Sequence, residues 1–452
     1  MSTPLNELAV PQAPGVRAAA KQRTIWSSAR TWSTRGTLAL LDQGLISGVN
    51  FLIGILLARH LADNQYGAYA LAFEVYLFLS VAYGALILEP LSVFGSSTYK
   101  DSNHEYLGAL IRVHGVIAFA IFVVLGACAW GLHVISPGGS MAAALVGVAI
   151  ASPCMLLFGL ARRGFYVKLS PRQAAVGALV YFTIVIGGLA VAYYHGLISP
   201  FVAFALMGAG AAVTAPIMLI RLRVSLNLRH GVLKISEVVH RHWGYGKWAL
   251  GSAVAIWFSG AIYYPLLGSF AGLADAGAFK ALTNFSSPVG QVFAALSLLS
   301  LPYAARIQHG KNSADSSRLA AKLAVIYAGG TVMYWLVIVL FRGPIVSHLY
   351  AGKYMEVTGL LPWLALGSIL RISATSQAVI LRSMHAPALV FVAYIAAGIV
   401  AVLVGVPCTW MFGLHGAVFT MVLSSAVALG VASLMVRRYG SPAEQLASQA
   451  VP

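Results

Sequence analysis

Four polar residues recur at helical spacing within an otherwise apolar stretch of this chain. Lys280, Asn284, Ser287 and Gln291 fall within about 60° of one another when residues are placed at about 100° intervals around a helix. An ammonium group beside amides and a hydroxyl can neutralise an anion and hydrate a sugar. We therefore interpret Lys280, Asn284 and Gln291 as the wall of an aqueous binding cavity. The alternative is hydrogen bonding to neighbouring helices.

A second polar face carries an arginine near the centre of another apolar stretch. Arg371 and Thr375 share this face. A permanently charged guanidinium suits a diphosphate, which it can hold through two hydrogen bonds. We therefore predict that Arg371 binds an anion, with Thr375 beside it. The alternative is an internal salt bridge from Arg371 to Glu74 or Asp42.

The first apolar stretches add further candidates. Gln43 and Asn50 line one face of the first stretch, and we assign them to the same binding cavity. Asp42 and Glu74 place carboxyl groups inside apolar stretches, where ionisable residues are costly and mark functional sites or internal pairs. They are our candidates for coupling to a proton or a sodium ion. No other cofactor and no metal site is predicted.

These residues must be positioned by membrane-spanning helices. Of the 452 residues, 59% are hydrophobic and only 9% are charged, which excludes a soluble globular enzyme and a disordered chain. A helix needs about 20 apolar residues to cross a bilayer. We predict an all-α polytopic membrane protein with about 12 transmembrane helices. The predicted spans are Gly36–Arg59, Gly67–Glu89, Leu107–Ile135, Met141–Ala161, Gln173–Tyr194, Leu197–Ile220, Trp248–Ala271, Asp275–Tyr303, Leu319–Phe341, Gly359–Leu381, Ala388–Met411 and His415–Val436.

The net charge of +17 is explained by topology. If the N-terminus is cytoplasmic, 23 of the 29 basic residues fall in cytoplasmic segments and three on the opposite side. This is the distribution that orients membrane proteins. It predicts a multi-pass membrane protein with both termini in the cytoplasm, and it removes the need for a nucleic-acid partner.

The predicted helices divide into two lobes of six around a central cavity. The divisions are a cytoplasmic basic segment (1–35), a first lobe (36–220), a cytoplasmic inter-lobe loop (221–247), a second lobe (248–438) and a cytoplasmic tail (439–452). When the chain is shifted by 210 residues, Tyr66-Gly67-Ala68-Tyr69 aligns with Ala276-Gly277-Ala278-Phe279. Because six is even, the two lobes would share one orientation, which suits transport by alternating access.

Several short motifs resemble those of a known family. Gln43-Gly44-Leu45, Asn50-Phe51-Leu52, Leu57-Ala58-Arg59-His60-Leu61 and residues 66–69 resemble the N-terminal signature of oligosaccharide flippases. These flippases belong to the multidrug/oligosaccharidyl-lipid/polysaccharide exporter (MOP) superfamily. Gly277-Ala278-Phe279 resembles the copy of this signature in the second lobe, and residues 349–354 resemble a later signature.

The resemblance implies a flippase that translocates undecaprenyl-diphosphate-linked oligosaccharide repeat units by alternating access. The product would be O-antigen, capsule or exopolysaccharide. The implied partners are the lipid-linked oligosaccharide, membrane lipid, a polysaccharide polymerase and chain-length proteins. The resemblance also places Arg59 at the mouth of the cavity, so Arg59 joins the candidate site.

Two other functions are weighed against this one. A multidrug antiporter of the same superfamily should have an acidic and aromatic cavity for cations, against which Arg371 and Lys280 argue. A membrane-embedded polysaccharide polymerase or ligase would need a long external loop, and the predicted external connections are short. The chain has no G-x-x-x-x-G-K-[ST] phosphate-binding loop. We therefore expect a transporter that is neither an enzyme nor an ATPase.

Overall fold

The computed structural model of the chain describes residues 14–225, 233–293, 296, 313–384 and 386–439. Every regular element in these ranges is a helix. The first lobe contains α1 (Pro14–His60), α2 (Asp63–Tyr83), α3 (Glu89–Phe94), α4 (Asn103–Ile135), α5 (Ser140–Val167), α6 (Pro171–Tyr194) and α7 (Pro200–Arg221). A π-helical turn, Gly84–Leu88, joins α2 to α3.

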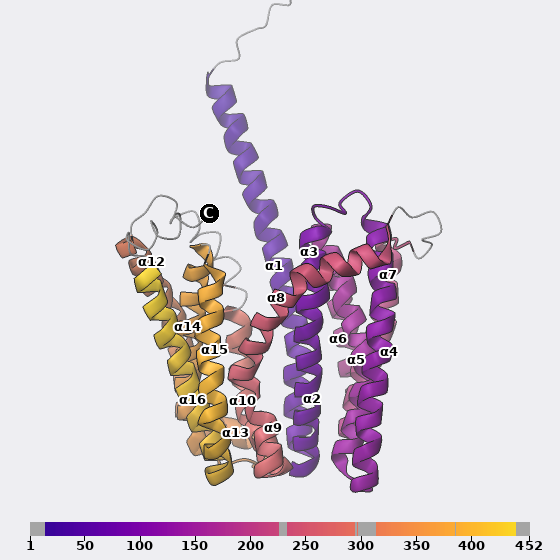
Figure 1. The fold of residues 1–452 in the computed structure, drawn as a ribbon, viewed down its shortest axis with the longest axis vertical. Coiled ribbons are helices and arrows are strands. Elements are labelled where there is room, and N and C mark those ends of the chain that lie inside the picture. The colour runs from indigo at the N-terminus through magenta and orange to yellow at the C-terminus, as the bar shows by residue number, and fades with distance from the viewer. Residues whose placement is uncertain (1–13, 226–232, 294–295, 297–312, 385, 440–452) are drawn as a thin grey trace, which may run out of the picture.

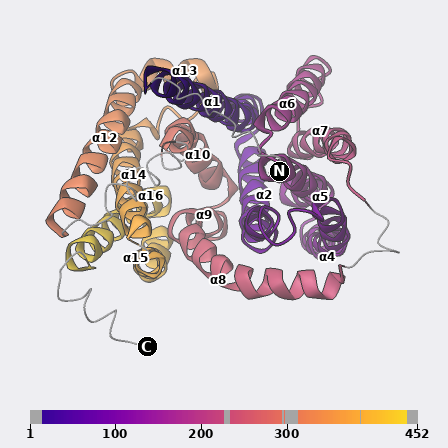
Figure 2. The ribbon, with the colours of Figure 1, turned by 90° about the horizontal axis from the view of Figure 1, so that it is seen from above.

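The second lobe follows a connecting helix, α8 (Ile235–Ala261). It contains α9 (Tyr263–Phe270), α10 (Leu273–Asn284), α12 (Ser313–Leu340), α13 (Arg342–Tyr350), α14 (Leu361–Ser383), α15 (Pro387–Leu403) and α16 (Gly405–Tyr439). A further helical segment covers residues 286–293. The two lobes lie side by side and meet where α2 of the first lobe packs against α10 of the second lobe (Figures 1 and 2).

The predicted all-α polytopic fold is confirmed. Within the described ranges, nine helices are long and apolar enough to cross a membrane, and a tenth span results if Ala249–Ala261 and Tyr263–Phe270 are counted as one span bent by 46°. The predicted eleventh span is a shorter apolar helix, Ala388–Leu403. The predicted eighth span corresponds to α10 and residues 286–293, and its last part lies outside the described residues.

Prolines and glycines account for several helix boundaries. Proline occupies one of the first two positions of α6, α7, α14 and α15, where its missing N–H costs no hydrogen bond. α10 ends at Asn284, four residues before Pro288. The ring of a proline clashes with the carbonyl group four residues earlier, and proline has no N–H to continue the helical hydrogen bonds. Gly413 interrupts α16 with φ of 53°, a left-handed conformation that favours glycine.

The two ends of the bundle differ in charge. We call the end where α1 enters the bundle and where Arg163, Arg221 and Arg437 lie the basic end, and the opposite end, which carries His60 and Tyr194, the far end. In Figure 1 the basic end is at the top.

The connection between the lobes is partly helical. The predicted inter-lobe loop, 221–247, contains the first turns of α8 from Ile235 onward, which cross the basic end of the first lobe (Figures 1 and 2). His242 fixes this part of α8 in place. Its Nδ1 donates to the carbonyl of Leu86 in the π-helical turn (3.0 Å), so its Nε2 accepts from the hydroxyl of Tyr106 (2.6 Å).

The segments found by the 210-residue shift pack against each other. α2 and α10 cross at Gly67 and Gly277, near the far end. A Cβ atom on Gly277 would lie 3.0 Å from the backbone nitrogen of Gly67 and from the carbonyl oxygen of Asp63. A Cβ atom on Gly67 would overlap the carbonyl oxygen of Leu273. The two lobes therefore meet through a backbone-to-backbone contact that only glycine permits at these positions.

We predict that Gly67→Ala destabilises the protein, because the added methyl group has no space against Leu273. Overpacking of this kind costs about 1–3 kcal/mol. The measurement is thermal melting in detergent micelles. Gly187→Ala is the matched control, since a Cβ atom there meets nothing within 4 Å. Equal melting temperatures for the two variants would contradict the crossing geometry.

A second prediction concerns pH. His242 precedes the membrane-spanning part of α8, and burial lowers its pKa below the usual 6.5. The unfolded chain therefore binds this proton more readily than the folded chain, so stability falls as the pH drops below about 6.5. We expect His242→Gln to reduce the loss of melting temperature between pH 7.5 and pH 5. The exposed His240 on the same helix provides the control, and His240→Gln should leave that loss unchanged.

Candidate functional site

The face of α14 that carries Arg371 changes from buried to exposed along the helix. Toward the far end, Leu364 and Ser368 are 0% and 3% exposed. Toward the basic end, Arg371 is exposed and Thr375 is partly exposed. The hydroxyl of Ser368 lies 3.1 Å from that of Ser286, so this face is packed in its far half and open in its basic half.

α1 shows the same trend on the face that carries Gln43. Gln43 is exposed, Asn50 is half-buried, and Gly54 is buried against the side chain of Asn284 from the second lobe. On that second lobe, Asn284 is buried and Gln291, nearer the basic end, is half-buried. The two lobes thus pack closely near the far end, and their facing polar side chains become less buried toward the basic end. We call the exposed and half-buried set the inter-lobe polar face; it consists of Gln43, Asn50, Gln291, Arg371 and Thr375.

Lys280 forms an ion pair with Glu74 across the lobes. Its Nζ lies 3.6 Å from Oε1 of Glu74, and the side chains are 11% and 7% exposed, respectively. The ammonium group also lies 4.7 Å from the ring centre of Phe73 and 5.5 Å from that of Tyr264. Both contacts are within the range of cation–π attraction. The charge of Lys280 is therefore balanced within the protein.

The other members of the predicted stripe also contact the first lobe. The amide of Asn284 donates to the hydroxyl of Tyr66 (3.0 Å). The amide of Gln43 donates to Oε1 of Gln291 (2.9 Å). Lys280, Asn284 and Gln291 therefore each contact a side chain of the first lobe in this conformation. Substrate contact by Lys280, Asn284 and Gln291 remains a prediction.

Asp42 is paired within the first lobe. The guanidinium of Arg162 donates to Oδ1 and Oδ2 of Asp42 (3.1 and 2.6 Å), and the hydroxyl of Tyr166 donates to Oδ2 (2.6 Å). The Asp42 side chain is 1% exposed. The bidentate geometry gives a buried carboxylate the partners it requires.

Arg371 is therefore not paired with either carboxylate proposed from the sequence. Glu74 pairs with Lys280 and Asp42 with Arg162, and among the described residues no carboxylate lies within ion-pair distance of Arg371. The inter-lobe polar face thus carries one cation that this part of the structure does not neutralise.

Arg59 lies at the far end, where it joins the lobes. Its Nη1 donates to the backbone carbonyl of His348 (3.1 Å), and Nζ of Lys353 donates to the carbonyl of Leu61 (2.5 Å). We call these two contacts the far-end latch. Lys353 falls within residues 349–354, one of the quoted motifs, but nothing in the sequence singles it out as a contact between the lobes. Arg59 and the inter-lobe polar face therefore lie on opposite sides of the Gly67–Gly277 crossing.

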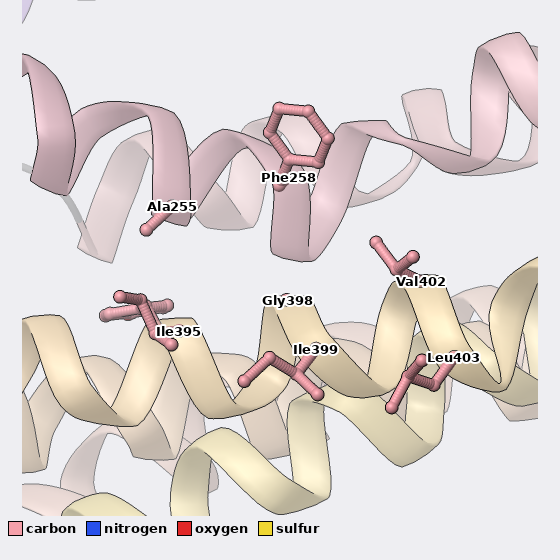
Figure 3. Close-up of a pocket in the computed structure, with 8 residues that line it drawn as sticks. Ala255, Phe258, Ile395, Gly398, Ile399, Val402 and Leu403 are labelled. Atoms are coloured by element: carbon pink, nitrogen blue, oxygen red, sulfur yellow. The ribbon is translucent and has the colours of Figure 1, made fainter.

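An apolar groove lies between α8 and α15 (Figure 3). It has a volume of about 360 Å³ and is lined by Ala255, Phe258, Tyr394, Ile395, Gly398, Ile399, Val402 and Leu403. Because its lining is apolar and carries no charged group, it cannot hold a charged headgroup. The inter-lobe polar face is the better candidate for such a site.

Comparison with known proteins shows the fold. No protein-family model matches the chain, and no curated protein matches it by sequence. Among solved structures, it resembles the inward-facing conformation of a multidrug resistance MATE family transporter of the MOP superfamily, with a TM-score of 0.69 at 13% identity, covering 91% of this chain and 96% of the other. It also resembles the lipid II flippase MurJ in an inward closed conformation, with a TM-score of 0.68 at 11% identity, covering 91% and 90%.

An outward-facing MATE structure of the MOP superfamily has the same fold, with a TM-score of 0.64 at 13% identity, covering 91% of this chain and 96% of the other. The chain thus has the two-lobed fold of MOP-superfamily transporters and is a multi-pass membrane protein.

We predict that Arg162→Met costs about 3–5 kcal/mol of stability, because it leaves Asp42 buried without its cation. The double variant Asp42→Asn with Arg162→Met removes both charges and should regain much of this loss. The free energies come from denaturant titration in mixed micelles. If the double variant were as unstable as the sum of the two single variants, the ion pair would not be the cause.

Proposed function

We propose that this protein is a flippase for a lipid-linked saccharide with an anionic diphosphate headgroup. The observation that carries the proposal is Arg371, a cation on the inter-lobe polar face without a carboxylate partner among the described residues. An unpaired charge at membrane depth is expensive, about 2.5–3.5 kcal/mol on insertion scales, and such residues are found on substrate pathways. A diphosphate would supply the missing negative charge.

The neighbouring groups suit the rest of such a headgroup. The amides of Gln43, Asn50 and Gln291 and the hydroxyl of Thr375 offer both donors and acceptors. Sugar hydroxyls require partners of both kinds, whereas the guanidinium provides only donors. The guanidinium would therefore bind the diphosphate, while the amides would hydrogen-bond the sugars.

The conformation suggests the direction of loading. We infer that the basic end is cytoplasmic, as the distribution of basic residues indicates. The headgroup would then enter from the inner leaflet of the bacterial inner membrane, while its prenyl tail stays in the lipid. Closure of the basic end and opening of the far-end latch would release it on the other side. O-antigen, capsule and exopolysaccharide units are the substrate classes that this proposal covers.

Export of cationic drugs is the competing proposal, because the similar structures include multidrug transporters. A site for a cation needs a carboxylate that is free to receive it. Glu74 and Asp42, the two carboxylates considered, each have a cationic partner at 3.6 and 2.6 Å. The pairing of these two carboxylates therefore favours an anionic substrate.

We predict that Arg371→Ala reduces transport of a prenyl-diphosphate-linked disaccharide in proteoliposomes by roughly tenfold to a hundredfold. The loss corresponds to charge-assisted hydrogen bonds worth about 1.5–3 kcal/mol. Arg371→Lys should give an intermediate rate, because a lysine keeps the charge but not the planar fork. Arg437→Ala, at the basic end of α16, is the control and should transport normally.

Two outcomes would overturn the proposal. One is unchanged transport by Arg371→Ala when the protein is folded and inserted. The other is uptake of a lipophilic cation that the wild-type protein carries and the diphosphate-linked substrate does not inhibit. That second outcome would establish drug export instead.

A further inference from the structure

Two helices of the first lobe, α5 and α7, end in a left-handed turn at the basic end. The residue two positions after the last helical residue has φ of 53° at Leu169, after α5, and 54° at Arg223, after α7. In both turns the N–H of the next residue donates to the carbonyl five residues earlier, at 2.9 Å after α5 and 3.3 Å after α7. These are the bonds of the Schellman motif, in which the left-handed position is usually glycine.

A leucine and an arginine therefore occupy positions that glycine would fit better. The left-handed conformation brings the Cβ atom of any other residue close to a backbone carbonyl oxygen. The far end of α6 shows the same motif with glycine, since Gly196 has φ of 65° and Leu197 N–H donates to the carbonyl of Ala192 (2.8 Å). Strained non-glycine residues of this kind concentrate at functional sites, where the side chain itself is needed.

The side chains at both turns are exposed and lie among cations. Leu169 is 59% exposed, and Ile220, close to Arg223 in the sequence, is 76% exposed. Nζ of Lys168 donates to the carbonyl of Leu222 (3.0 Å), which joins the end of α5 to the end of α7. We call the four exposed cations at the ends of α5 and α7 and the start of α6 the basic rim; it consists of Lys168, Arg172, Arg221 and Arg223.

The charge of the basic rim is not balanced in the described part of the chain. No carboxylate of the described residues lies within ion-pair distance of its members, and Nη1 of Arg221 donates to the neutral side-chain carbonyl of Gln173 (3.2 Å). Partial burial and the nearby charge of Arg223 lower the pKa of the Lys168 ammonium. An anion bound at the basic rim would relieve this repulsion.

Helix dipoles account for only part of this arrangement. The C-terminal ends of α5 and α7 favour cations such as Lys168 and Arg223. The same effect disfavours Arg172, which lies in the first turn of α6, where the dipole attracts an anion. It also gives no reason for the exposed leucine at position 169. A bound ligand with an anionic part and an apolar part explains all of these residues together.

The position of the basic rim identifies the kind of ligand. α5, α6 and α7 are membrane-spanning helices, so residues at their ends lie at the level of the lipid headgroups. Leu169 and Ile220 add exposed apolar side chains beside the cations. A phospholipid presents a phosphate directly above its acyl chains, whereas a free ion has no apolar part. Basic clusters next to membrane spans are typical sites for anionic lipids.

We propose that the basic rim binds the phosphate of an anionic phospholipid. Arg223 and Lys168 contact the phosphate, and Leu169 contacts the upper part of the acyl chains. The left-handed turns then place a cation and an apolar side chain where glycine would supply neither. This site lies on the outer ends of the first lobe, away from the inter-lobe polar face, and does not depend on which substrate is transported.

The test compares three additives on the full chain in an uncharged detergent. Melting temperatures are recorded while phosphatidylglycerol, phosphatidylcholine or inorganic phosphate is titrated in, because a ligand of the folded state raises the melting temperature. We expect phosphatidylglycerol alone to raise it. An equal rise with phosphatidylcholine would reveal a general lipid effect, and an equal rise with inorganic phosphate a site for a free anion. Either result would overturn the proposal.

The double variant Leu169→Gly with Arg223→Gly separates lipid binding from folding. Without lipid it should melt no lower than the wild-type protein, because the relief of two left-handed residues offsets the greater freedom of the unfolded chain. Its titration midpoint for phosphatidylglycerol should rise at least about tenfold, as expected for the loss of one charge-assisted hydrogen bond. Side chains that served only the fold would lower the melting temperature without lipid when removed.

The matched control is Arg437→Gln, which removes an exposed charge from the basic end of the second lobe. It should leave the titration midpoint unchanged. An equal loss of affinity in this control would show that the total charge, and not the basic rim, attracts the lipid. An unchanged midpoint in the double glycine variant would reject the site. The proposed transport function is tested separately, at Arg371.

Discussion

The close approach of α2 and α10 determines how the two lobes meet. Gly67 and Gly277 let the backbones of the two lobes touch near the far end. Because side chains beyond a backbone contact are held at fixed separations, this crossing brings Glu74 to Lys280 and Tyr66 to Asn284. Small residues commonly allow such helix contacts in membranes, where no hydrophobic force acts between helices. The polar face exposed toward the basic end is the part of the interface that this contact does not close.

The charged side chains within the helices differ in whether they have an ion-pair partner. Buried cations and carboxylates that meet inside the protein cancel, as Lys280 and Glu74 do between lobes and Arg162 and Asp42 do within one lobe. Arg371 is left without a carboxylate among the described residues, on a face that is exposed. This difference between paired and unpaired charge, rather than the net charge of the chain, is what points to an anionic ligand.

The local features of this fold were predictable from the sequence, whereas the pairings between helices were not. Apolar runs and helical periodicity depend on neighbours along the chain, and they predicted the helices and the common face of Lys280, Asn284 and Gln291. The 210-residue shift found the two glycine segments but could not show that they touch. The sequence left Glu74 and Asp42 as possible ion-pair partners of Arg371. In the structure these two carboxylates pair with Lys280 and Arg162 instead, because the partners depend on how distant helices pack. For the same reason the sequence could not identify Arg162 as the partner of Asp42.

If the space between the lobes binds an anionic lipid headgroup, the affinity for a lipid must depend on the charge of its headgroup. We would measure by calorimetry the affinity of the detergent-solubilised wild-type protein for three lipids with the same short prenyl chain. We expect the prenyl diphosphate to bind most tightly, the monophosphate more weakly and the uncharged alcohol least. A prenyl ammonium that binds as tightly as the diphosphate and competes with it would show that the site does not select an anion.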